Sequence, residues 1–174
     1  MNKTFHVISL GCAKNTVDSD SMAQILLGAD YDFVGSSAEA GIIIVNTCGF
    51  IGPAKDESYQ VLGELAAEKR PDQVLIAAGC LTQRYGEQVV KRVPGIDGVL
   101  GTRRWMDILK VVESLREGRH PRPLYHLPEA STVGSEEAGV PRVAIQGNSA
   151  YLKIADGCRR PCAFCAIPLI KGPV

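Results

Sequence analysis

Six cysteines carry the clearest chemical signal in this sequence, and they fall into two groups of three. The compact group, Cys158, Cys162 and Cys165, has the spacing C-x3-C-x2-C. Thiolates this close on an irregular loop cannot pair as disulfides without strain, but they can bind one polynuclear metal centre. No fourth Cys or His lies nearby in the sequence, so one metal position stays open, as a cluster that binds a small molecule requires. The alternative is a zinc knuckle that takes its fourth ligand from elsewhere.

The other group is scattered: Cys12, Cys48 and Cys80 each come directly after a predicted strand. The carboxyl ends of parallel strands share one edge of a sheet, where open α/β folds bind their ligands, so these cysteines are expected to converge. Any one of them alone is equally well explained as a buried core residue. The shared position of all three favours a second metal site, and Gly11 and Gly79 beside two of them would let the backbone approach a bulky cluster.

Strands alternating with helices must position these cysteines. Strands are predicted over residues 4–10, 31–34, 41–45, 73–78 and 98–100. Helices are predicted over residues 15–27, from Pro53 to the residues before Pro71, over 82–92, and after Thr102, which can cap the last helix. Residues 41–45 are apolar and rich in β-branched side chains, typical of a strand buried on both faces. The pattern predicts a doubly wound α/β domain with a mostly parallel sheet over residues 1–118.

The remaining sequence does not follow this alternation. Residues 119–149 are rich in proline and small polar residues, which predicts a linker or an irregular segment. A further strand is predicted over residues 151–155, directly before the compact cysteine group. Residues 150–174 are therefore interpreted as the first strand and loop of a second, incomplete domain.

Composition excludes several classes of protein. The chain has 174 residues, with 19 Lys and Arg against 19 Asp and Glu, so it lacks the cationic excess of a polybasic nucleic-acid binder. Apolar runs such as residues 42–45 are too short to span a membrane, and no signal peptide is evident at the N-terminus. These features predict a cytoplasmic protein with reduced cysteines. The basic stretch after residue 102 is interpreted as a solvated helix face, with RNA contact possible but not indicated.

The segment from Cys158 to Cys165 resembles the cluster loop of radical S-adenosylmethionine enzymes. The sequence before it is similar to the N-terminal domain of the methylthiotransferases in that superfamily. Within them, residues 9–20, 46–51 and 79–86, together with Ala54, Glu57 and Ser58, resemble the branch that modifies a ribosomal protein. The branch that modifies tRNA adenosine more often has Gln-Met-Asn after its first cysteine and Arg after its second. This sequence has Ala13-Lys14-Asn15 and Phe50-Ile51 at those places.

The resemblance implies two 4Fe–4S clusters. Cys158, Cys162 and Cys165 would hold the cluster that binds S-adenosyl-L-methionine, and Cys12, Cys48 and Cys80 would hold a second cluster that carries the sulfur to be transferred. The implied acceptor is the β-carbon of an aspartate in small-subunit ribosomal protein S-twelve, and the implied electron donor is a flavodoxin or ferredoxin. The resemblance assigns no catalytic side chain beyond the ligands. It covers only the N-terminal part of such an enzyme, so this chain alone is expected to be inactive.

Two alternatives remain open from the sequence. One is the same chemistry on tRNA adenosine. The other is a non-enzymatic iron–sulfur or zinc-binding protein that carries electrons or metal.

Overall fold

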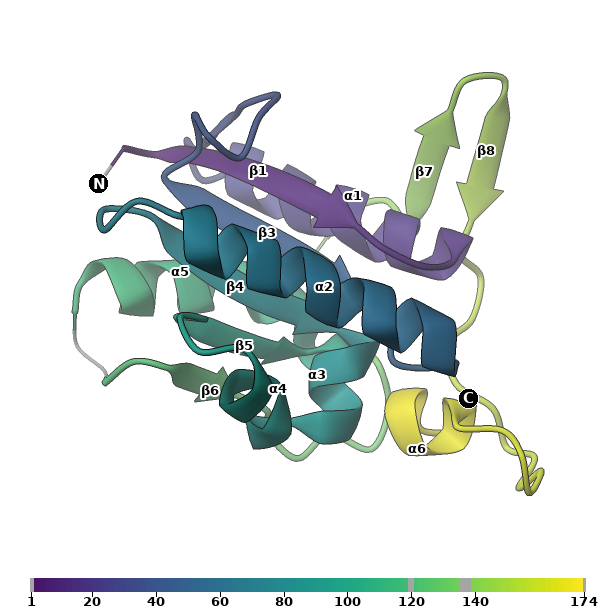
Figure 1. The fold of residues 1–174 in the computed structure, drawn as a ribbon. Coiled ribbons are helices and arrows are strands. Elements are labelled where there is room, and N and C mark those ends of the chain that lie inside the picture. Colours follow the sequence, from purple (N-terminus) through teal and green to yellow (C-terminus); the bar gives the residue numbers. More distant parts are fainter. Residues whose placement is uncertain (1, 119–120, 135–138, 174) are drawn as a thin grey trace.

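The computed structural model describes residues 2–118, 121–134 and 139–173. Within these residues the main sheet is parallel throughout, with the strand order β2-β1-β3-β4-β5-β6 (Figure 1). Its strands are β1 (Thr4–Ser9), β2 (Asp32–Phe33), β3 (Ile42–Thr47), β4 (Val74–Gly79), β5 (Gly98–Gly101) and β6 (Leu124–His126). The predicted α/β class with a mostly parallel sheet is confirmed.

Helices cover both faces of this sheet. Helix α1 (Ala13–Leu27), the 3-10 helix η1 (Thr102–Asp107) and α5 (Ile108–Arg116) pack on one face. Helices α2 (Gly52–Glu68), α3 (Cys80–Tyr85) and α4 (Glu87–Arg92) pack on the other face, which is turned toward the viewer in Figure 1. This is the doubly wound arrangement that the sequence predicts.

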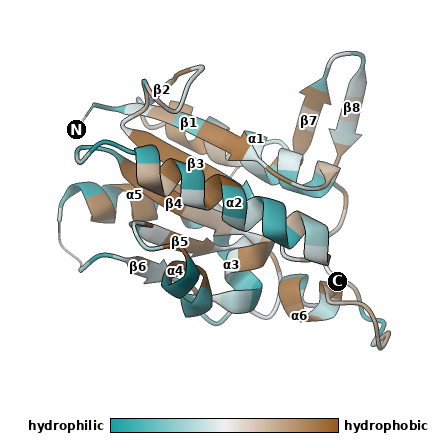
Figure 2. Ribbon diagram, in the orientation of Figure 1, coloured by the Kyte–Doolittle hydropathy of each residue, from teal (hydrophilic) through white to brown (hydrophobic). Residues whose placement is uncertain are grey.

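The central strands divide their side chains between two cores. Ile42 and Ile44 pack with α1 and α5, whereas Ile43 and Val45 pack with α2 and α3. All four are at most 2% exposed, which explains why this strand reads as a continuous apolar run (Figure 2). Burying one aliphatic side chain of this size contributes about 1.5–3 kcal/mol, so the central strands fix the position of the loops that follow them.

Two local predictions are wrong. The helix predicted over residues 82–92 is two helices, because Gly86 between them has φ +48°, a left-handed conformation that ends α3. Thr102 does not cap a helix. Thr102 is instead the first residue of η1, and its hydroxyl oxygen accepts a hydrogen bond from Nζ of Lys171 at 2.6 Å.

The segment after α5 contains structure that the periodicity did not predict. Strand β6 lies inside the predicted linker and pairs with β5 at the edge of the sheet. Strands β7 (Val143–Gln146) and β8 (Ser149–Leu152) form an antiparallel hairpin, and α6 (Ile167–Lys171) follows the compact cysteine group (Figure 1). The strand predicted over residues 151–155 thus starts earlier and pairs in a hairpin. Residues 119–120 and 135–138 of the predicted linker lie outside the described residues. The division into residues 1–118, 119–149 and 150–174 stays a prediction.

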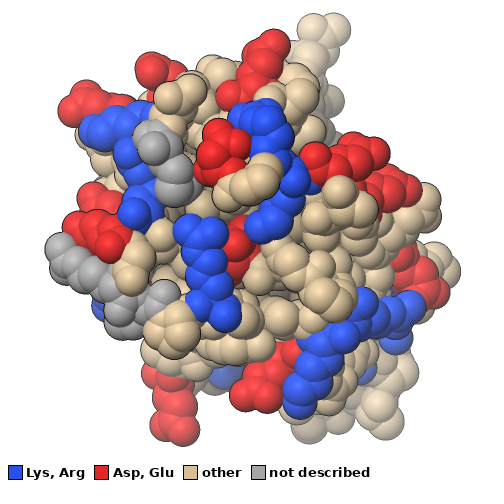
Figure 3. Space-filling model, turned by 60° about the vertical axis from the view of Figure 1, so that its left-hand side comes forward, with Lys and Arg blue, Asp and Glu red and all other residues tan. Residues whose placement is uncertain are grey.

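The surface carries charges of both signs. On the face in Figure 3, Lys and Arg side chains alternate with Asp and Glu side chains, in keeping with the zero formal net charge. Across the described part of the chain, no helix has the length and apolar character needed to cross a membrane.

Candidate metal centre

The scattered cysteines lie at the carboxyl ends of three neighbouring strands. Cys12 follows β1 and is the N-cap residue of α1, Cys48 follows β3, and Cys80 is the first residue of α3 after β4. The helices after β1 and β3 pack on opposite faces of the sheet, so a crevice opens between these strand ends. Open α/β sheets bind their ligands at this kind of reversal point.

The three cysteines line one cavity of about 550 Å³. Lys14 and Lys171 are the charged residues among those described in its wall, and the rest of the wall is largely apolar. Its lining comprises Gly11, Cys12, Lys14, Asn15, Cys48, Phe50, Ile51, Ala54, Cys80, Ile167, Ile170 and Lys171. The predicted convergence toward one edge therefore takes the form of a shared cavity. The role of the three thiols as cluster ligands stays a prediction.

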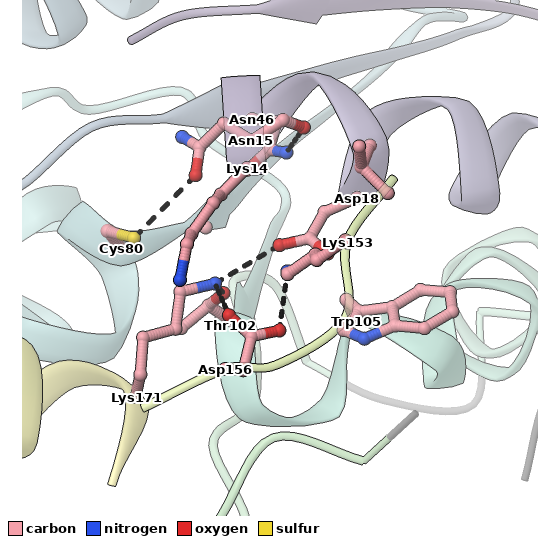
Figure 4. Close-up of polar contacts among 12 residues, drawn as sticks. Lys14, Asn15, Asp18, Asn46, Cys80, Thr102, Trp105, Lys153, Asp156 and Lys171 are labelled. Atoms are coloured by element: carbon pink, nitrogen blue, oxygen red, sulfur yellow. Dashed lines mark hydrogen bonds and ion pairs between the residues drawn. The ribbon is translucent and has the colours of Figure 1, made fainter. Parts of the chain in front are cut away.

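Asn15 ties the three strand ends together. Its Nδ2 atom donates hydrogen bonds to the carbonyl oxygens of Leu10, at 2.9 Å, and Thr47, at 3.0 Å. Its Oδ1 atom lies 3.7 Å from Sγ of Cys80 and accepts the weak thiol hydrogen bond (Figure 4). Asn15 is 1% exposed, so these bonds form in a low-dielectric interior, where a broken one is costly. One amide side chain thus sets the relative positions of all three cysteine loops.

Backbone packing also fixes the loop that carries Cys48. The Oγ atom of the fully buried Ser58 accepts a hydrogen bond from the Cys48 N–H group at 3.0 Å. Gly11 has φ +96°, and a Cβ atom added there would lie 2.7 Å from Cβ of Cys48. Gly49 is equally restricted, because an added Cβ atom would lie 2.7 Å from Cα of Leu81. Only glycine lets the three loops approach this closely.

The electrostatic environment of Cys80 is unusual. Burial raises the pKa of its thiol to about 11, and the nearby charge of Lys171 offsets only part of this effect. Because the thiolate is the form that binds metal, ligation at Cys80 must displace a proton. The positive end of α1 and the Lys171 ammonium both favour negative charge in the cavity.

The compact group lies on the loop before α6. Cys162 is exposed, and Cys158 and Cys165 are half-buried. The Cys165 N–H group donates to the Cys162 carbonyl oxygen at 3.1 Å, and the Arg160 N–H group donates to Sγ of Cys158 at 3.4 Å. The loop closes at its base, where the Cys158 N–H group donates to the Gly172 carbonyl oxygen at 2.9 Å.

The two groups meet through α6. Ala166, next to Cys165, and Ile170 pack with Cys80 in a small buried cluster. Ile167, Ile170 and Lys171 complete the wall of the first cavity. Residues that follow the second cysteine group therefore cover the site of the first.

The donor set is suited to iron–sulfur clusters. Each group offers three thiols, and the first group faces a cavity with room for a non-protein ligand. Within residues 2–118, 121–134 and 139–173, no three Cys, His, Asp or Glu side chains converge closely enough to hold a single metal ion.

A buried charge cluster beside the cavity was missed by sequence reasoning. Asp18, only 2% exposed, forms ion pairs with Lys171 at 3.1 Å and Lys153 at 2.6 Å, and also with Arg142. Burial raises the pKa of Asp18, but the three positive charges outweigh it and hold the pKa below its ordinary value. Lys153 also pairs with Asp156 at 2.5 Å (Figure 4). In the sequence, Asp18 is one acidic residue within the predicted helix over residues 15–27. No local pattern could have paired it with residues more than 120 positions away.

Comparison with known proteins agrees with the predicted resemblance. A family model described as "Uncharacterized protein family UPF0004" matches residues 4–101. The chain is 44% identical over 174 residues to "Ribosomal protein uS12 methylthiotransferase RimO" of Bdellovibrio bacteriovorus, an alignment that covers 98% of this chain and 37% of that protein. The protein of the same name from Roseiflexus sp. is 41% identical, in an alignment that covers 97% of this chain and 39% of that protein. The one from Acetivibrio thermocellus is 39% identical, in an alignment that covers 99% of this chain and 39% of that protein. The chain spans less than two-fifths of the length of these relatives.

Proposed function

Because the chain belongs to the UPF0004 family, whose model covers more than half of its residues, we propose that it is part of a methylthiotransferase acting on ribosomal protein uS12. The proposed cofactors are S-adenosyl-L-methionine and two 4Fe–4S clusters. The acceptor follows from the names of the relatives, which are 39–44% identical over nearly all of this chain.

The observation that carries the proposal is the arrangement of the six cysteines. Cys12, Cys48 and Cys80 line one cavity at the ends of adjacent strands, and the helix after Cys165 forms part of its wall. Two three-thiol groups joined by one short helix suit a reaction that uses two clusters side by side. A protein that carries a single metal ion would need only one of these groups.

In this proposal the clusters supply the electron that cleaves S-adenosyl-L-methionine and the site that holds the sulfur. The chain's own residues bind and orient them. Cys12, Cys48 and Cys80 provide thiolates for one cluster, and Cys158, Cys162 and Cys165 provide thiolates for the other. The apolar wall, with Phe50 and Ile170, offers few polar groups that could hold water in the first cavity.

Lysine side chains set the charge of that cavity. Lys14 and Lys171 line it. Burial lowers the pKa of Lys171, but the negative charges of Asp18 and Asp156 outweigh burial and hold the pKa above its ordinary value, so Lys171 stays protonated at neutral pH. A fixed positive charge stabilises anionic thiolates and sulfide in a low-dielectric site.

Other partners follow from the same proposal. A one-electron donor such as a flavodoxin or ferredoxin would reduce the clusters in the cytoplasm.

The 174-residue chain supplies only three thiols and a hairpin for the S-adenosyl-L-methionine site, so it should not turn over alone. The chain does not hold S-adenosyl-L-methionine and the acceptor in reactive contact. Misplacement of reacting atoms by about 1 Å can cost about 10²-fold in rate.

The test uses a longer protein that contains this chain. The protein is reconstituted anaerobically with iron and sulfide and is given S-adenosyl-L-methionine, dithionite and either a uS12 peptide or unmodified tRNA. Mass spectrometry should show a methylthio group on an aspartate of the peptide, and the Cys48→Ala variant should leave the peptide unmodified. Modification of tRNA in place of the peptide would contradict the proposed acceptor.

A further inference from the structure

Helix α6 is short, and contacts from distant parts of the chain hold both its buried face and its carboxyl end. It begins two residues after Cys165 and ends at Lys171. Ile170 is fully buried and packs with Ala166 against Cys80. A five-residue helix has little stability of its own, so its position must come from these contacts.

Arg103 binds the carboxyl end of α6. Its Nε atom donates to the carbonyl oxygen of Ile170 at 3.0 Å, and its Nη2 atom donates to that of Leu169 at 2.7 Å. Its Nη1 atom donates to the carbonyl oxygen of Ala130 at 2.7 Å. A planar guanidinium can hold three fixed acceptors at once, and a cation at a helix carboxyl end is electrostatically favourable. Arg103 lies in the basic stretch interpreted as a solvated helix face, yet its half-buried guanidinium donates to three backbone carbonyl groups.

Lys171 anchors the other side of the same turn. Its Nζ atom donates to Oδ2 of Asp18 on α1 at 3.1 Å and to Oγ1 of Thr102 at 2.6 Å. The side chain is 4% exposed, and such an ammonium is tolerated only when charged and polar partners replace its water. The Lys171–Asp18 ion pair therefore stabilises one position of α6 against α1, because in any other position the buried ammonium would lose its partners.

These contacts reach the second cysteine loop directly. Gly172, next to Lys171, accepts the hydrogen bond from the Cys158 N–H group that closes the loop. Cys165 lies two residues before the first residue of α6. Both ends of the 158–172 loop are thus joined to a helix that Arg103 and Lys171 hold in place.

We propose that Arg103 and Lys171 are positioning residues, together termed the α6 latch, which seat α6 over the first cysteine cavity, hold the second cysteine loop beside it and so set the separation of the two metal sites. The claim that this separation serves sulfur transfer rests on the proposed function. The seating itself does not require any cluster to be bound.

The first test uses the iron-free 174-residue chain. Because α6 covers Cys80, the rate at which N-ethylmaleimide modifies Cys80, followed by peptide mass spectrometry, reports opening of the latch. We expect Arg103→Gln and Lys171→Met to raise this rate by about tenfold or more, through loss of charge-assisted hydrogen bonds.

Matched variants separate the latch from general destabilisation. Lys171→Arg keeps the charge and should restore protection. Lys91→Met removes a lysine on α4 that is 75% exposed and should leave the rate unchanged. Circular dichroism verifies that each variant is folded. Folded Arg103→Gln and Lys171→Met chains in which Cys80 reacts as slowly as in the wild type would overturn the proposal.

The second test uses the reconstituted, reduced chain. Two nearby paramagnetic clusters broaden each other's electron paramagnetic resonance signals, and Arg103→Gln should reduce this broadening while the iron content stays unchanged. Equal broadening in the variant and the wild type would count against the latch. Failure of the wild-type chain to take up iron would count against the proposed function, and the alkylation experiment would still decide the latch.

Discussion

The Nζ atom of Lys171 lies 3.1 Å from Oδ2 of Asp18, although 153 positions separate the two residues in the sequence. Asp18 belongs to α1, the helix that starts after Cys12, and Lys171 ends α6, the helix that follows Cys165. The ion pair therefore joins the helix after the first cysteine to the helix after the last. Both side chains are almost fully buried, so the pair is structurally specific as well as attractive.

The first prediction concerns Asp18 and pH. At pH 7, Asp18→Asn should lower the free energy of unfolding by about 3–5 kcal/mol, because it leaves buried cations without their counter-charge. The pKa of Asp18 is lowered in the folded chain, so the stabilisation is present above its ordinary pKa of 3.8 and is lost as the pH falls through the folded value. The difference between wild type and variant should therefore shrink below about pH 4.

Urea unfolding followed by circular dichroism at pH 7, 4 and 2.5 measures this difference. The control is Asp72→Asn, which changes a carboxylate that is 66% exposed and should alter stability by less than about 0.5 kcal/mol. A pH-independent effect of Asp18→Asn would show that the charge of Asp18 is not what stabilises the cluster.

The sequence predicts the sheet better than it predicts the contacts that join its two ends. The strand around Ile43 is predictable because residues buried on both faces must be apolar, and the following Cys48 then falls at the carboxyl edge. The roles of Asn15 and Lys171 are not predictable, because they depend on partners brought close only by tertiary folding. Strand β6 also escaped prediction. It has three residues at the edge of the sheet, too few to display a period.

The second prediction concerns Gly79, the residue before Cys80. Its φ is +103°, and an added Cβ atom would collide with the side chain of Asn46 and lie 2.6 Å from the carbonyl oxygen of Thr47. Gly79→Ala should lower the free energy of unfolding by about 1–3 kcal/mol or more, because it adds strain at a left-handed position to a steric clash. The thermal midpoint, measured by circular dichroism, should fall accordingly.

Gly63 provides the matched control, because it lies inside α2 with nothing within 4 Å of an added Cβ atom. Gly63→Ala should raise stability by about 0.5–1 kcal/mol through its higher helix propensity. Equal midpoints for the two alanine variants would contradict the proposed tight approach of the cysteine loops.

The third prediction concerns Asn15. Asn15→Asp keeps the shape but replaces the Nδ2 donor with an oxygen that faces the carbonyls of Leu10 and Thr47. Unfolding should become easier by about 1–3 kcal/mol, because buried acceptors lose their partner. Iron bound by the first cysteine group should also decrease, whereas the exposed Asn2→Asp change should affect neither quantity. Normal iron content in a folded Asn15→Asp chain would argue against its positioning of the cysteine loops.

The fourth prediction concerns the independence of the two sites. Cys48→Ala removes one thiol of the first group and leaves Cys158, Cys162 and Cys165 unchanged. After anaerobic reconstitution this variant should retain about half of the wild-type iron, because the two sites use separate ligands. Circular dichroism shows whether the variant is folded. Complete loss of iron from a folded variant would mean that the sites do not assemble independently.

The most direct test of the central claim, that this chain holds two separate cluster sites, is a count of iron and acid-labile sulfide after anaerobic reconstitution. We expect about eight iron atoms and about eight sulfide ions per chain, since each 4Fe–4S cluster contains four of each. An absorption spectrum typical of such clusters should accompany them and bleach on reduction. One zinc ion per chain with no sulfide would contradict two cluster sites, and so would iron that fills a single site in the wild-type chain.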